Sequence, residues 1–218
     1  MEYPINTIES TLHERKRVLH DKIANLSYNY SWSQLLTVLN ENKSSINACR
    51  LSKSGIKPKL YTPLHQAAFG SASVEVIQEL IGLKASRTLR TNERNETAYD
   101  IAARCNASEE ILHLLKVPSN ILDKSEVIGK MEKALHKIIL GRSEKLVEEH
   151  QLQLPQLSFL YEFGSFWFPV PGMYGGFNVE KCEKGIQVES WCRVVGGSGQ
   201  RHIIDENGHY DLVDEGFV

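Results

Sequence analysis

The chain has 218 residues, of which 24% are charged and 41% are hydrophobic, and its formal net charge is −2. These values are ordinary for a globular protein, and the length allows one compact domain or two small ones. Residues 1–11 contain no basic segment followed by an apolar one, and nowhere do about 18 apolar residues follow one another, so we expect neither a secretory signal peptide nor a membrane-spanning helix.

The N-terminal part of the chain is predicted to be helical. We expect residues 1–30 to form a capping region built on a helix over residues 17–27. A second helix is predicted over residues 32–40, because leucines recur there at helical spacing. These leucines are Leu35, Leu36 and Leu39.

A short motif, TPLHQAA at residues 62–68, has a clear physical interpretation. Thr62 can cap a helix, Pro63 suits its first turn, and the two alanines permit close helix contact. His65 can hydrogen-bond the Thr62 hydroxyl, which predicts a structural histidine. A weaker copy, TAYDIAA, lies 35 residues later at residues 97–103.

Each motif is followed by a second predicted helix, so each unit contains two antiparallel helices. Ser73 can cap a helix over residues 74–81, and Ser108 can cap one over residues 109–115. A polar stretch over residues 84–96, here called the finger, separates the two units. The loop over residues 47–61, here called the exit loop, precedes the first motif.

These motifs resemble those of ankyrin repeat proteins, and the resemblance covers residues 31–118. It implies a short ankyrin-repeat helical solenoid of two to three units plus capping helices, with the finger placed for contact with partners. The chain departs from the pattern at Ala98 and Asp100, which replace proline and histidine, and in the length of the exit loop. Helices over residues 17–27 and 125–149 are expected to complete the short stack.

The character of the chain changes after residue 118. Residues 119–162 are predicted to form a helical linker or cap, with a helix over residues 126–149 that Gly141 interrupts. From residue 163 to 218 we expect an antiparallel β-meander, and the fold class is therefore α+β. Its strands are predicted over residues 166–170, 172–177, 186–195, 201–205 and 210–213, with a hairpin turn at Asn207-Gly208.

This C-terminal β extension resembles a segment found in small bacterial ankyrin-type proteins. The resemblance is carried by FPVPGMYGGF at residues 168–177 and by GGSGQRH at residues 196–202. The latter lies before a strand rather than a helix, so we interpret it as a turn and not as a phosphate-binding loop.

Charge is distributed unevenly along the chain. We predict that basic residues of the exit loop and finger, together with an acidic tail, bind a partner protein; a solvated rim is the alternative explanation of the basic residues. A nucleic-acid partner is not expected, because aromatic residues are not interleaved with these lysines and arginines, as single-strand binding would require. The predicted partner-binding residues are Arg50, Lys53, Lys57, Lys59, Arg87, Arg90, Arg94, Asp205, Glu206, Asp211, Asp214 and Glu215.

A possible pocket in the β extension would bring a carboxylate, a guanidinium and an imidazole together. Residues 189, 191 and 193 alternate on one side of a strand, and they could face the next strand's basic residues. The alternative interpretation is a cross-strand ion pair beside a hydrogen-bonded histidine. The residues concerned are Glu189, Trp191, Arg193, Arg201 and His202.

The cysteines match neither a metal site nor a disulfide framework, since none belongs to a CxxC pair or has a histidine at zinc spacing. We expect free thiols, no metal and no cofactor, in a reducing cytoplasm. The four cysteines are Cys49, Cys105, Cys182 and Cys192.

Together these features predict a non-enzymatic protein–protein interaction module of the cytoplasm, with no catalytic residues and no membrane partner. By analogy with short bacterial ankyrin proteins, the specific hypothesis is an immunity protein that inhibits a bacterial toxin, its acidic tail covering a basic cleft. Two alternatives stay open. One is a small enzyme or ligand-binding β module delivered by the repeats, and the other is a host-directed effector.

Overall fold

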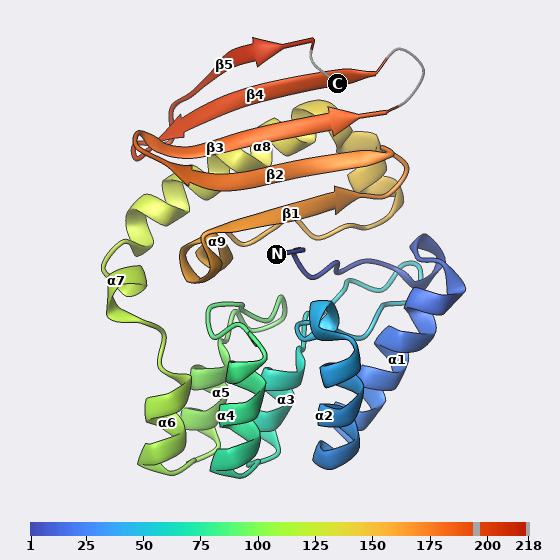
Figure 1. Ribbon diagram of the computed structural model, residues 1–218, viewed down its shortest axis with the longest axis vertical. Coiled ribbons are helices and arrows are strands. Elements are labelled where there is room, and N and C mark those ends of the chain that lie inside the picture. The colour runs from blue at the N-terminus through green and yellow to red at the C-terminus, as the bar shows by residue number, and fades with distance from the viewer. Residues whose placement is uncertain (194–196, 217–218) are drawn as a thin grey trace. The chain divides into compact units, whose positions relative to one another are not determined.

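The structure of the protein is a computed structural model, which is described here for residues 1–193 and 197–216 (Figure 1). Internal contacts divide the chain into two compact units. One, here called the helical unit, is Asn6–Pro118; the other, the sheet unit, consists of Met1–Ile5 and Ser119–Val218. The structure thus has helices and an antiparallel sheet, which is the predicted α+β class.

The helical unit contains three consecutive helix pairs. Helices α1, α3 and α5 contact one another in that order, and α2, α4 and α6 do the same in a second layer. The unit therefore consists of stacked pairs, α1–α2, α3–α4 and α5–α6. Its elements are η1 (Glu9–Thr11), α1 (Glu14–Tyr28), α2 (Trp32–Glu41), η2 (Lys43–Ser45), α3 (Pro63–Phe69), α4 (Val74–Gly82), α5 (Ala98–Arg104) and α6 (Glu109–Leu115).

Apolar side chains at helical spacing fill the space between the two layers. Leu35 and Leu39 of α2, Leu64 of α3, and Ile77 and Leu80 of α4 are completely buried. The helix predicted over residues 17–27 is α1, and it serves as the first member of a pair rather than as a separate cap, because it packs on both α2 and α3.

Buried side-chain amide groups link the connections between the pairs. Asn47, which is 4% exposed, accepts a hydrogen bond from the backbone N–H of Ser86 at 2.8 Å and donates one to the carbonyl oxygen of Lys84 at 3.2 Å. One side chain of the exit loop thereby satisfies two backbone groups at the start of the finger.

The sheet unit is a five-stranded antiparallel meander in the order β1-β2-β3-β4-β5. Figure 1 shows the long helix α8 crossing one face of this sheet. Its helices are α7 (Ser119–Leu122), α8 (Ser125–Glu149) and α9 (Ser158–Phe163), and its strands are β1 (Ser165–Val170), β2 (Gly175–Cys182), β3 (Gly185–Cys192), β4 (Ser198–Asp205) and β5 (Tyr210–Glu215). In α8 the backbone leaves helical geometry at Ser143, two residues after the predicted break.

Several predicted strand boundaries differ from the structure, most of all that of β2, which runs to Cys182 and not to residue 177. The strand predicted from residue 172 begins only at Gly175, because Gly172 and Tyr174 have φ values of 79° and 51°, which suit a turn and not a strand. The strand predicted over residues 186–195 is described up to Cys192, and its last two predicted residues lie outside the described ranges.

The first residues of the chain belong to the sheet unit instead of the predicted N-terminal cap. The Trp167 N–H donates to the Met1 carbonyl at 2.8 Å, and the Tyr3 N–H donates to the Trp167 carbonyl at 2.8 Å, so this segment pairs with β1. Tyr3 is 2% exposed, and its ring packs on Phe159 and Phe166 at centroid distances of 5.1 and 5.3 Å. Burial of this aromatic ring explains the assignment.

Candidate functional site

The start of α3 is held by the predicted hydrogen bond between Thr62 and His65. The Thr62 hydroxyl and the Thr62 backbone N–H lie 2.8 and 3.2 Å from Nδ1 of His65, while Nε2 of the same ring lies 3.1 Å from the carbonyl oxygen of Leu89. A neutral ring that accepts at Nδ1 and donates at Nε2 satisfies all three contacts. Burial lowers the pKa of His65 to about 4, so the ring is neutral near pH 7 and its role is structural.

An analogous cap begins α5, with a carboxylate in place of the imidazole. Asp100 Oδ2 accepts hydrogen bonds from the backbone N–H and the hydroxyl of Thr97, both at 2.8 Å. The Asp100 N–H in turn donates to the Thr97 hydroxyl oxygen at 3.2 Å. The departure from the repeat pattern at residue 100 therefore keeps the cap.

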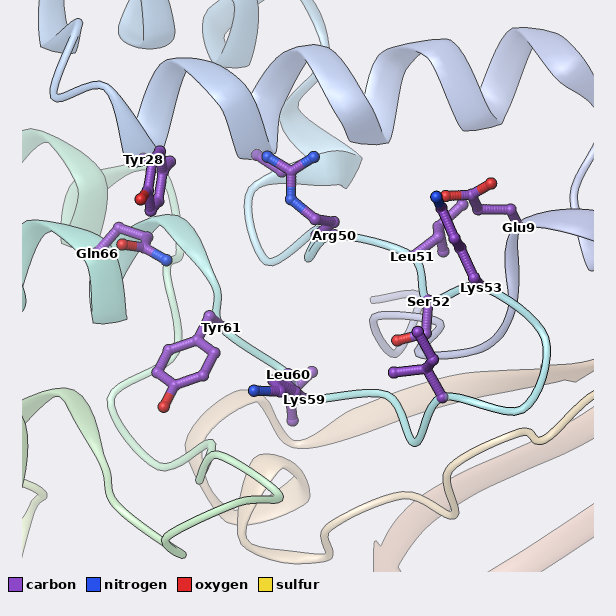
Figure 2. A pocket seen from close by; sticks show the side chains of 12 residues that line it. Glu9, Tyr28, Arg50, Leu51, Ser52, Lys53, Lys59, Leu60, Tyr61 and Gln66 are labelled. Atoms are coloured by element: carbon purple, nitrogen blue, oxygen red, sulfur yellow. The ribbon is translucent and has the colours of Figure 1, made fainter.

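A groove of about 480 Å³ opens in the helical unit near the start of α3, where Tyr61 and Gln66 line it (Figure 2). Its walls come from α1, the exit loop and the beginning of α3, which Figure 2 shows as Tyr28, the segment from Arg50 to Tyr61, and Gln66. The lining is Glu9, Ala24, Tyr28, Arg50, Leu51, Ser52, Lys53, Ile56, Lys59, Leu60, Tyr61 and Gln66.

Apolar side chains line the groove from its floor to its rim. Leu51 and Leu60 are buried, with 3% and 2% of their surface exposed. Ile56 and Tyr28, by contrast, are 52% and 67% exposed although both line the groove. A partner that filled the groove would cover these two side chains and gain the free energy of burying them.

Cationic groups accompany the apolar surface. Arg50, Lys53 and Lys59 line the groove together with a single carboxylate, that of Glu9. Lys59 also forms an ion pair outside the lining, with Nζ 3.2 Å from Oε1 of Glu93. Arg50 is oriented by a 2.6 Å hydrogen bond from Nη2 to Oδ1 of Asn25 on α1. A cationic groove of this kind favours an acidic partner.

Backbone pairing anchors both ends of the exit loop. The Glu9 N–H donates to the Ser52 carbonyl at 2.8 Å, and the Ser52 N–H donates to the Thr7 carbonyl at 3.1 Å. At the other end, Asn92 of the finger donates from its backbone N–H to the Lys59 carbonyl at 3.1 Å and from Nδ2 to the Pro58 carbonyl at 3.0 Å. The groove is therefore largely formed before any partner arrives.

Only some of the predicted basic residues line the groove. Arg50, Lys53 and Lys59 line the groove, whereas Lys57 and Arg94 are exposed and absent from its lining.

The remaining basic residues of the finger are partly buried. Arg90 donates from Nη1 to the Asn95 carbonyl at 2.9 Å and lies 3.5 Å from Oδ2 of Asp100, so its charge supports the cap of α5. Arg87 is half-buried beside Ser86 and Thr88.

The predicted acidic residues also differ in their surroundings. Oδ1 of Asp205 accepts hydrogen bonds from the backbone N–H groups of Asn207 and His209 at 2.9 and 2.8 Å. These bonds, led by the one from His209, lower the pKa of Asp205. Asp205 thus holds the predicted hairpin turn. The other four predicted acids, Glu206, Asp211, Asp214 and Glu215, are exposed.

The possible pocket in the β extension is not assembled. Glu189 and Arg201 are directly opposite on β3 and β4 and form a 2.6 Å ion pair, which agrees with the alternative interpretation. His202 pairs with Val188 and so faces the other side of the sheet, where it is 9% exposed. Arg193 follows the end of β3, and Trp191 packs on Trp167 at 5.7 Å. Strand alternation separates the histidine from the ion pair.

Sequence reasoning missed the apolar part of the groove. Tyr28 ends α1, Ile56 and Tyr61 lie in the exit loop, and none belongs to a motif. The available signal was the unusual length of the exit loop, which supplies most of the lining.

Within the two described ranges, no helix is long and apolar enough to cross a membrane, and no group of three or more His, Cys, Asp and Glu residues could hold a metal ion. The cysteines described there are free, and Cys49 is buried.

Comparison with known proteins gives one informative likeness. An ankyrin repeat protein of fowlpox virus (strain NVSL) is 33% identical to this chain over 94 residues, which make up 42% of this chain. The chain spans about a quarter of that relative's length, the matched part being 26%. No family model and no solved structure matches the chain. This likeness points to ankyrin-like repeats in the chain.

Proposed function

We propose that the helical unit is a non-enzymatic protein-binding module, and that its groove receives an acidic segment of another protein that carries an apolar side chain. The single observation that carries this proposal is the exposure of Ile56 and Tyr28, at 52% and 67%, in a groove that three cationic side chains line. Exposed apolar groups next to fixed charges are typical of an interaction surface.

The repeats support a protein partner over other classes. The fowlpox virus relative is named for its ankyrin repeats, and stacked helix pairs commonly serve recognition. Anchoring of the exit loop at Ser52 and Lys59 adds to this, because a preformed groove loses little conformational freedom when it binds.

The finer form of the proposal is that the partner is a bacterial toxin and that this protein is its cytoplasmic immunity protein. The exposed acids Asp211 and Glu215 on β5 favour this, since they could cover a basic active-site cleft. Coexpression of this protein with the product of the gene next to its own, as the candidate toxin, tests the immunity hypothesis. We expect this protein to restore the growth of cells that the candidate toxin inhibits. If the candidate is toxic when expressed alone and growth is not restored, the immunity hypothesis is contradicted for that pair.

The two other candidates gain less support. A small enzyme in the β extension would need Glu189, Arg193 and His202 to converge, and Glu189 and His202 lie on opposite sides of the sheet. A host-directed effector would share every feature of the groove, and the identity of the bound protein separates it from an immunity protein.

Affinity capture from the native cell tests the groove itself. The full chain is compared with a double variant, Ile56→Asp with Lys53→Glu, which places negative charge inside the groove. A matched control, Lys57→Glu, adds negative charge to the same loop outside the lining. We expect one stoichiometric protein with the wild type and with Lys57→Glu, and its loss with the double variant. Equal recovery by all three proteins would refute the groove as the binding site.

A further inference from the structure

The sheet ends at a strand whose side chains are all exposed. β5 pairs with β4 on one side (Figure 1), and all six of its residues, from Tyr210 to Glu215, are exposed. Within the described residues β5 is the last strand of the sheet order. Every second N–H and C=O group of such a strand points away from its neighbour and can pair with another extended segment.

The opposite edge of the sheet, at β1, is paired with another segment of the chain. There the first residues of the chain pair with β1, through the hydrogen bonds that join Trp167 to Met1 and Tyr3. The chain thus covers one edge of its own sheet, while in the described parts of the chain no segment pairs with the outer side of β5.

β5 also presents apolar side chains that a further strand would cover. Tyr210 is opposite Ile204, and Leu212 is opposite His202, so both belong to the side of the sheet that carries the buried residues. They nevertheless remain 42% and 46% exposed, and Val213, the extra residue at the register shift, is 53% exposed. The strand contains no lysine or proline, two of the residues that commonly block an edge, and its edge-protecting features are the bulge at Val213 and three carboxylates.

The charge of the edge selects its occupant. Asp211 and Glu215 are exposed, and Asp214 is only partly neutralised by Arg201 at 3.2 Å. Two copies of this strand would bring acidic side chains against each other, which disfavours pairing between identical chains. A strand with basic residues would be attracted instead.

We infer that β5 is a docking edge on which an extended basic segment of another protein, with alternating apolar residues, pairs as a sixth strand. Backbone hydrogen bonds would hold the segment, Tyr210 and Leu212 would contact its apolar side chains, and Asp211 on the other side of the sheet would contact a lysine or arginine. Glu215, which is opposite Gln200 and so lies on the side of Leu212, would contact a basic residue at the end of the segment. This surface is separate from the groove and does not depend on it, although it shares Asp211 and Glu215 with the finer form of the proposed function.

Selection from random 12-residue peptides displayed on phage, with the full chain as target, tests this inference. The edge variant is Asp211→Lys with Glu215→Lys. The matched control is Glu148→Lys with Glu149→Lys, which makes the same change in charge at two exposed residues of α8 in the same unit. Both variants are first shown to have the wild-type circular dichroism spectrum.

We expect enriched peptides that alternate basic and apolar residues, bind the control like the wild type, and bind the edge variant at least about tenfold more weakly. N-methylation of every second residue of such a peptide should abolish binding, because it removes the N–H donors of one edge. Failure to enrich peptides, binding that the edge variant leaves unchanged, or binding that survives N-methylation would each overturn the inference. Self-association of the wild type that Leu212→Lys removes would assign the edge to a second copy and also overturn it.

Discussion

Asp100 occupies the place in the third helix pair that His65 occupies in the second. Each accepts hydrogen bonds from the threonine three residues earlier, at 2.8 Å from the hydroxyl of Thr62 or Thr97. The imidazole also reaches the Leu89 carbonyl, whereas the carboxylate lies beside Arg90. The same turn is thus held by a neutral group in one pair and by a charged group in the next, and this difference can be measured.

The first prediction concerns the pH dependence of stability. Burial lowers the pKa of His65 to about 4, from 6.5 in an exposed histidine. Because the pKa is depressed in the folded state, the unfolded chain takes up the proton first as the pH falls. The contribution of the neutral His65 ring to the free energy of unfolding is therefore complete above pH 6.5 and is lost as the pH falls to about 4. Its upper limit is about 3 kcal/mol. Denaturant unfolding between pH 7.5 and 4.5 should therefore depend less on pH in His65→Gln, and an unchanged slope would contradict the assignment.

Removal of the second cap should destabilise the helical unit. Asp100→Ala leaves the Thr97 backbone N–H without its 2.8 Å acceptor and is expected to lower the free energy of unfolding by about 1 kcal/mol. Asp100→His should lose less, because an imidazole serves the same turn at residue 65. Arg94→Ala, at an exposed residue of the finger, is the control and should change the midpoint of unfolding little.

A larger loss is expected at Asn47. Asn47→Ala would leave the backbone N–H of Ser86 and the carbonyl of Lys84 without their partner in a buried region, at a cost of about 2–3 kcal/mol. The control Asn40→Ala removes an exposed amide and should cost well under 1 kcal/mol. Similar losses in the two variants would show that the Asn47 contacts are not important for stability.

Thiol reactivity provides an independent measurement of burial. The pKa of Cys49 is raised to about 12 by burial, so at pH 8 its thiol is almost entirely protonated. Alkylation of the native protein with iodoacetamide, followed by mass spectrometry, should modify Cys49 last. Cys105, Cys182 and Cys192 are only partly buried and should react earlier. Early modification of Cys49 would indicate that the exit loop opens readily.

The fold was predictable where local chemistry determines it. Threonine caps, the Pro63 turn and regular leucine spacing gave helices close to those observed, and glycine turns gave an antiparallel meander of three to five strands, of which five are seen in the described residues. Errors occurred where distant contacts decide. The burial of Tyr3 against Phe159 transfers the first residues to the sheet unit, and no local pattern at residues 1–5 indicates this.

The candidate site was only partly predictable for the same reason. The basic residues of the exit loop were identified by charge, and three of them line the groove. Its apolar lining depends on α1 and the exit loop meeting in space, which periodicity does not reveal. The sequence also suggested that Glu189 and His202 could converge, but the strand register places them on opposite sides of the sheet.

Photo-crosslinking from residue 56 in the native cell tests the central claim most directly. Ile56 is replaced by p-benzoylphenylalanine in the full chain, and Leu36, a partly buried residue of α2 outside the groove lining, receives the same replacement as the control. The account predicts that residue 56 alone crosslinks to one protein, through a segment rich in acidic residues. Crosslinking to that protein from residue 36 but not from residue 56 would show that binding occurs elsewhere and would contradict the proposed groove.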